Sequence, residues 1–238
     1  MRAFIYGIGV QWKLDLRNKG ILITYYLVPL VFFGFMGMIF TSINPEMKDT
    51  LIQTMTIFAF SMGAFLGTPS SISEMYSGDI KKAFKVGGIP LWAGAVNHFI
   101  SAFIHLLITG IIIYIIAPFA FDAKLPENPV LYFISTAVFL MVNISIGTVL
   151  GLYVKSPAKL TMFAQLLFLP SLMLSGIMFP TNMLPKAVAV VGYALPATWG
   201  LKLMTESELN ILNIVILLLF FTGAVIISSY KLAKIGID

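Results

Sequence analysis

Six long stretches of this 238-residue sequence contain no Asp, Glu, Lys or Arg, and they constrain the fold more than any other feature. A helix needs about 20 residues to cross about 30 Å of hydrocarbon, because each residue advances it by about 1.5 Å. The six stretches meet that requirement: Ile21 to Phe40, Leu51 to Ser71, Leu91 to Ala117, Leu131 to Val154, Thr161 to Phe179 and Ile211 to Tyr230. The sequence therefore predicts an all-α membrane protein with six transmembrane helices.

The composition supports a membrane environment and excludes several kinds of chemistry. Hydrophobic residues make up 59% of the chain and charged residues 11%, against roughly 45 to 50% and about 25% in soluble domains. Cysteine is absent, which excludes disulfides, cysteine nucleophiles and iron–sulfur clusters. The first apolar run is too long for a signal peptide and no cleavage site follows it, so we expect it to be retained.

The distribution of Lys and Arg predicts the orientation of the chain. The N-terminus, the second and fourth connections and the C-terminus hold eleven of these residues, and the other three connections hold four. Because basic loops stay on the cytoplasmic side, we expect both termini to be cytoplasmic in a multi-pass protein of the cell membrane.

The basic residues lie in short segments rather than on one globular face, so we expect no nucleic-acid partner. Residues 1–238 are interpreted as one transmembrane domain.

The N-terminal segment, residues 1–19, has the pattern of an amphipathic helix. One face at 100° per residue carries Phe4, Ile5, Ile8, Trp12 and Leu16. This pattern predicts a helix in the membrane interface, with Trp12 at headgroup depth. Asp15 and Lys19 lie on the apolar side against this pattern, and a loose basic tail is the alternative.

The second connection, residues 72–90, has the signals of a short cytoplasmic helix. Ser77 suits a helix cap, Asp79 suits the positive end of the helix dipole, and Gly87 with Gly88 would end the helix. Its apolar stripe would consist of Ile80, Ala83 and Phe84. Such a short helix is marginal alone in water, so the stripe is expected to rest on the membrane surface or on a partner protein.

The segment between the fifth and sixth runs, residues 180–210, is apolar but divided by prolines. Pro180, Pro185 and Pro196 leave pieces that are too short to span the bilayer. These features predict re-entrant half-helices that enter the outer leaflet, where irregular backbone is tolerated only if protein or a water-filled cavity covers it. We therefore expect this region to line or cap a path.

Together these segments resemble the type-2 ABC exporter permease family. The resemblance rests on six spans, the Glu-x-x-x-Gly segment after the second span, Leu-Ser-Gly-Ile-x-Phe-Pro-x-x-x-Leu-Pro from Leu174 to Pro185, and the later Leu-Pro-x-Thr. It implies that an ATP-binding subunit docks at Glu74, Gly78, Asp79, Ile80, Lys81, Ala83 and Phe84. The motif from Leu174 to Pro185, together with the proline of the Leu-Pro-x-Thr segment, marks a gate region. The residues of this region are Ser175, Gly176, Phe179, Pro180, Pro185 and Pro196. The sequence departs from the family at Tyr76, where a second acid is usual, and at Asp79, where Thr is usual.

The resemblance implies a permease subunit that exports a hydrophobic or amphipathic substrate, such as a drug, an antimicrobial peptide or a lipid-like molecule. It also implies two copies of an ATP-binding subunit and a second permease copy or paralogue. The chain lacks a phosphate-binding Gly-x-x-x-x-Gly-Lys-Ser/Thr loop, so ATP and Mg are expected on the partner, and no cofactor or metal on this chain. An ion-coupled secondary transporter or channel is the alternative. A membrane-embedded enzyme is disfavoured, because no catalytic motif is present.

Several polar and small residues inside the spans have two interpretations. His98 and His105 are seven residues apart and share a helix face. They act either in the path, as a proton relay or a substrate contact, or as ordinary contacts between helices. Asn143 has the same two interpretations, a path residue or a packing residue. Gly63 to Gly67 and Gly147 to Gly151 match the small-x-x-x-small pattern. That pattern predicts close helix packing.

Overall fold

A computed structural model of the chain describes residues 2–77, 82, 84, 86–178, 184–206 and 208–237. Within these residues, six helices are long and apolar enough to span a membrane, which confirms the predicted fold class. The first span comprises α2 (Lys19–Leu22), the π-helical turn η1 (Ile23–Leu27) and α3 (Val28–Ile43). The second comprises α4 (Leu51–Met62), the π-helical turn η3 (Gly63–Gly67) and α5 (Thr68–Ser77). The others are α7 (Leu91–Phe121), α8 (Pro129–Tyr153), α9 (Pro157–Leu174) and α12 (Ile211–Ile237).

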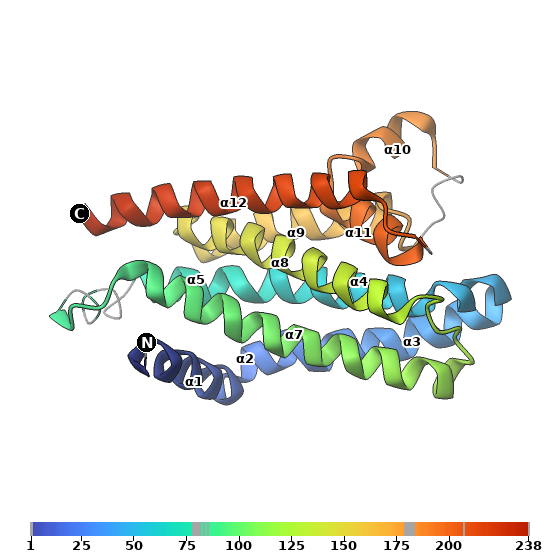
Figure 1. Ribbon diagram of the computed structural model, residues 1–238, viewed down its shortest axis with the longest axis horizontal. Coiled ribbons are helices and arrows are strands. Elements are labelled where there is room, and N and C mark those ends of the chain that lie inside the picture. Colours follow the sequence, from blue (N-terminus) through green and yellow to red (C-terminus); the bar gives the residue numbers. More distant parts are fainter. Residues whose placement is uncertain are drawn as a thin grey trace.

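The remaining described elements are short or lie outside the spans. They are α1 (Arg2–Arg17), the 3-10 turn η2 (Pro45–Asp49), α10 (Lys186–Gly192) and α11 (Pro196–Thr205). The spans run side by side along the long axis of the molecule (Figure 1). Both termini and the connection from α5 to α7 lie at one end, and the α3–α4 and α7–α8 connections lie at the other (Figure 1). This arrangement is the one that an even number of spans requires.

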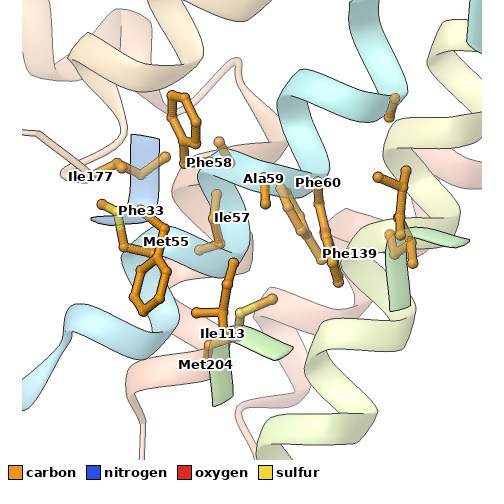
Figure 2. Close-up of a cluster of buried hydrophobic side chains, with 14 of the residues drawn as sticks. Phe33, Met55, Ile57, Phe58, Ala59, Phe60, Ile113, Phe139, Ile177 and Met204 are labelled. Atoms are coloured by element: carbon orange, nitrogen blue, oxygen red, sulfur yellow. The ribbon is translucent and has the colours of Figure 1, made fainter. Parts of the chain in front are cut away.

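The second span forms the centre of the bundle. Its most apolar window is 94% buried, against 28% for the first span and 22% for the sixth. Figure 2 shows buried residues of α4, among them Phe58 and Phe60, in one cluster with Ile113, Phe139 and Met204. The other spans therefore pack around α4, and they leave apolar outer faces for lipid or for another protein.

The glycine pattern predicted close packing, and the structure confirms it. A Cβ placed on Gly147 would clash with the backbone oxygen of Ala64, and one on Gly151 would lie 2.6 Å from the backbone oxygen of Pro69. The fourth span thus packs with its glycines against the backbone of the second span. A side chain at either position would have to push the two helices apart.

The second span extends further than the sequence predicted. We expected it to end at Ser71, but α5 continues to Ser77, and the helix that Ser77 was expected to cap begins outside the described residues. The extension is stabilised because Ile72, Met75 and Tyr76, spaced at helical intervals, form a small buried cluster with Ala95 and Leu152. The first part of the predicted connection is therefore helix.

The N-terminal helix α1 lies alongside the first half of α7 (Figure 1). Its buried and half-buried positions are Phe4, Gly7, Ile8, Gln11, Trp12 and Asp15. Ile5 and Leu16 of the predicted stripe are exposed and do not pack on the bundle, and contact of the stripe with the membrane interface stays a prediction. The face that α1 turns toward α7 is set by polar contacts such as that between Asp15 and Ser101. A pattern of hydrophobic residues contains no information on such contacts.

The region between the fifth and sixth spans contains two short helices. In α11, Pro196, Ala197, Thr198 and Gly200 are buried, and the helix packs against α4, α8, α9 and α12. The smaller helix α10 protrudes at the end of the bundle opposite the termini (Figure 1). Two half-length helices agree with the prediction, whereas their depth in the outer leaflet stays a prediction.

Candidate functional site

The connection after the second span carries most of the predicted coupling residues. Gly78, Asp79, Ile80, Lys81 and Ala83 lie outside the described residues. Glu74 is described and is exposed on α5. Phe84 is described and is half-buried. The described part of this connection therefore comprises its two ends, with Glu74 on one and Phe84 on the other.

Phe84 faces the bundle rather than solvent. It packs on the small cluster around Met75 and Tyr76, and its ring contacts the position of Gly94 at the start of α7. The Tyr76 hydroxyl donates a hydrogen bond of 2.5 Å to the backbone oxygen of Leu91. The aromatic residue at position 76, which departs from the family pattern, is thus a core residue that ties α5 to α7.

The exposed part of this connection includes Val86, Ile89 and Glu74. Val86 is 90% exposed and Ile89 is 46% exposed. Glu74 lines a polar cleft of about 150 Å³ with Asn18, Thr24, Ser70 and Ser71. This end of the molecule therefore exposes two apolar side chains and a carboxylate, which suit contact with another protein.

A second cluster, which we call the α1–α7 junction, comprises Gln11, Trp12 and Asp15 of α1 with Ser101 and His105 of α7. Asp15 is only 1% exposed. The Ser101 hydroxyl donates to Asp15 Oδ2 at 2.5 Å, and Gln11 Nε2 donates to Asp15 Oδ1 at 2.8 Å. Burial raises the pKa of the Asp15 carboxyl, and these two hydrogen bonds offset part of that effect.

His105 joins the junction to the first span. Its ring stacks on Trp12 with centroids 3.8 Å apart and planes 5° apart. The Tyr26 hydroxyl lies 2.6 Å from His105 Nδ1. His105 is therefore a contact between three elements, one of the two interpretations open from the sequence.

His98 and Asn143 are buried in α7 and α8. Neither ring nitrogen of His98 has a hydrogen-bond partner among the described residues. Asn143 Nδ2 donates to the backbone oxygen of Phe139 at 2.8 Å, which is a bond within its own helix. The structure thus brings His105, but not Asn143, into a polar cluster with other elements.

The predicted gate region is described on both sides of Phe179 and Pro180, which themselves lie outside the described residues. Gly176 has a φ of 93°, a backbone conformation that favours glycine. The Ser175 hydroxyl donates to the backbone oxygen of Ser171. These contacts end α9 in a tight turn.

The far end of the gate region differs between its two prolines. Pro185 is exposed, whereas Pro196 is buried at the start of α11. The Thr198 hydroxyl donates at 2.5 Å to the backbone oxygen of Gly192 and connects α11 to α10. Among the described gate residues, Ser175 and Pro196 are thus buried in the bundle, whereas Pro185 is exposed.

The sequence did not predict the α1–α7 junction, although it contained a signal. Asp15 stands on the apolar face of a helix, where a charge is out of place unless it has polar partners. Ser101 and His105 share a face of the third span. Pairing these two anomalies would have predicted the contact.

The fold and these surfaces define a multi-pass helical membrane protein whose second span is its axis. Comparison with known families makes this class specific, because the family model of the ABC-2 type transporter matches residues 3–209. The chain belongs to this family, and it is the membrane part of an ABC transporter.

A curated relative is similar over much of this chain. ABC transporter G family member 20 of Dictyostelium discoideum is 24% identical over 170 residues, which are 70% of this chain. The chain spans only 23% of that protein's length.

Proposed function

We propose that the chain is the permease subunit of an ATP-driven exporter, powered by a separate ATP-binding subunit. The observation that carries the proposal is the family match over residues 3–209, which includes all but the last span. The six spans supply the membrane part of such a machine. ATP and Mg are assigned to the partner subunit.

The connection after the second span is the proposed docking site for the ATP-binding subunit. Glu74 and Val86 are exposed there, at the end of the bundle that holds both termini. Phe84 anchors the connection to α5 and α7 from inside, so movement of the docked partner would be transmitted to the second and third spans. The roles of Gly78, Asp79, Ile80, Lys81 and Ala83 stay predictions from the family resemblance.

A second permease copy or a paralogue is proposed to complete the translocation path. The fifth span supports this assignment, because it exposes a stripe of large apolar residues at helical spacing. The stripe consists of Met162, Leu166, Leu169 and Met173. An assembly of two permeases would then carry two ATP-binding subunits.

The proposed substrate is hydrophobic or amphipathic: a drug, an antimicrobial peptide or a lipid-like molecule. This class is proposed from the resemblance to exporter permeases. Outward transport is proposed from the resemblance to exporters. An ion-coupled transporter is the second candidate, and the buried Asp15, His98 and His105 favour it.

The docking proposal is tested by Val86→Asp in the full chain, co-expressed with its proposed ATP-binding subunit. Val86 is 90% exposed, so the substitution leaves the bundle packing intact, but it places a carboxylate in the contact with the partner. We expect co-purification of the ATP-binding subunit to fall by at least about tenfold, because a buried unpaired charge costs well over 1.4 kcal/mol. Phe84→Asp is a poorer test, since Phe84 also packs on the bundle.

Val190→Asp is the matched control, because Val190 is 65% exposed and lies in α10 at the opposite end of the molecule. It should leave co-purification unchanged. Full retention of the ATP-binding subunit by Val86→Asp would contradict the docking site. Substrate transport by the purified chain in liposomes without ATP would instead support the ion-coupled alternative.

A further inference from the structure

The α1–α7 junction contains a buried carboxyl group that the proposed export function does not require. Asp15 is 1% exposed, and both of its oxygens accept hydrogen bonds from neutral donors, Ser101 and Gln11. No ion pair to Asp15 is found among the described residues. An ionised carboxylate in such surroundings lacks the compensation that water or a cation would provide.

The titratable and charged side chains near Asp15 belong to three elements. On α1, Lys13 and Arg17 are exposed and point away from the junction. On α7, the titratable groups are His98 and His105, and on η1 they are Tyr25 and Tyr26. None of these side chains forms a salt bridge with Asp15 in the described structure, so the neutral acid suits the docked state.

A single non-helical residue, Asn18, separates α1 from the first span. Asn18, between α1 and α2, has extended backbone angles, φ −85° and ψ 104°. Its side-chain oxygen accepts from the backbone nitrogens of Gly20 at 2.9 Å and Ile21 at 3.3 Å. The first span therefore starts with its own cap and does not depend on α1 for its first turn.

We propose that Asp15 is a protonation-dependent positioning residue that holds α1 against the first half of α7. In its protonated form it completes the hydrogen bonds with Ser101 and Gln11 without burying a charge. In its ionised form it favours release of α1 about Asn18, which exposes the carboxylate to water. The position of α1 thus becomes sensitive to pH at the end of the bundle that carries the proposed docking site.

The sign of the pH dependence follows from the raised pKa of the docked Asp15 carboxyl. When α1 is released, the carboxyl returns to an ordinary pKa of about 3.9. Docking is then most stable below that value, and it weakens as the pH rises to the pKa of the docked state. Above the docked pKa the stability of docking becomes constant.

The absence of cysteine allows a direct measurement of docking by disulfide cross-linking. A Cβ on Gly7 would lie 2.6 Å from Asn97 Nδ2, so Gly7→Cys and Asn97→Cys form a reporter pair across the junction. Lys48→Cys and Lys124→Cys form a control pair at the other end of the bundle, where the backbone nitrogen of Lys124 donates to the backbone oxygen of Lys48 at 3.0 Å. Dividing the rate of the reporter pair by that of the control pair removes the effect of pH on thiol ionisation. Cross-linking of the control pair also shows that the bundle is folded.

Three forms of the full chain are compared in lipid vesicles: the native chain, Asp15→Asn and Asp15→Ala. The cross-linking ratio of each is measured from about pH 4.5 to about pH 9. With Asp15 we expect the cross-linking ratio to fall by at least about threefold as the pH rises. Asp15→Asn, which is neutral and of similar shape, should keep a high ratio at every pH. Asp15→Ala should give a low ratio throughout.

Two results would overturn the proposal. One is equal pH dependence in Asp15→Asn and the native chain, which would assign the effect to His98 or His105. The other is full docking of α1 in Asp15→Ala. The experiment needs no ATP-binding subunit, so its outcome is independent of the proposed export function.

Discussion

Gly147 and Gly151 show how single residues set the distance between two spans. Each faces the backbone of the second span, at Ala64 and Pro69. In a bilayer no hydrophobic effect drives helices together, so such close van der Waals contact supplies much of the association energy. Glycine is needed here for its lack of a side chain and not for its backbone freedom.

At this scale we predict that Gly147→Ala destabilises the bundle. The added methyl group clashes with backbone that cannot move away, and overpacking of this kind costs about 1 to 3 kcal/mol. Unfolding in mixed micelles, followed by circular dichroism, measures the change. Gly34→Ala is the control, because a Cβ there meets no atom within 4 Å. Equal stability of the two variants would show that the spans are further apart than described.

The two π-helical turns show how elements are joined within the membrane. The turn η1 presents the backbone oxygen of Tyr25 to the Thr109 hydroxyl of α7 at 2.7 Å. Tyr25 is also completely buried, and its hydroxyl lies 3.2 Å from Thr68 Oγ1. A π-helical turn shifts the backbone hydrogen bonds of a helix, and such turns often mark functional positions. Here the turn joins the first span to the second and the third.

At the scale of elements we predict that Thr109→Val loosens the contact between the first and third spans. Valine keeps the shape of threonine but removes the donor to Tyr25, which should cost about 0.6 to 1.7 kcal/mol. The same unfolding measurement applies. Thr161→Val is the matched control, since the Thr161 hydroxyl bonds only within its own helix, to Pro157, and it should leave stability nearly unchanged. A loss no greater than that of the control would exclude Thr109 as an interhelical contact.

The whole molecule has two ends that differ in charge. The connections rich in Lys and Arg lie at the end that holds both termini. Among the described residues, the opposite end carries two ion pairs, Lys48 with Asp122 at 3.4 Å and Lys124 with Asp49 at 2.9 Å. The positive-inside rule predicts that the first end faces the cytoplasm.

At this scale we predict the orientation of the chain in intact cells. Val86→Cys and Lys124→Cys lie at opposite ends, and both native side chains are largely exposed. A membrane-impermeant maleimide should label only the cysteine at position 124. Permeabilised cells provide the control, since both positions should then react. Labelling of position 86 from outside would reverse the topology and remove the basis for the proposed docking site.

Hydrophobicity and charge alone were sufficient to predict the six spans, because the bilayer penalises charge in every span regardless of its neighbours. They were not sufficient to predict the end of α5 or the rotation of α1. Ile72 and Tyr76 extend α5 because α7 and α8 cover them. On α1, the hydrophobic pattern gave an apolar face with Leu16, whereas the face that packs on α7 includes Gln11 and Asp15.

The sequence by itself determined the number of spans, the family pattern and the glycines that permit close packing. Only the tertiary structure decided that the second span is the axis, that Phe84 faces the bundle and that Asp15 is buried against Ser101. The physical reason is that transfer into lipid depends on each segment alone. Contacts between residues as distant as Asp15 and Ser101 depend on how whole helices pack, and no local pattern records that packing.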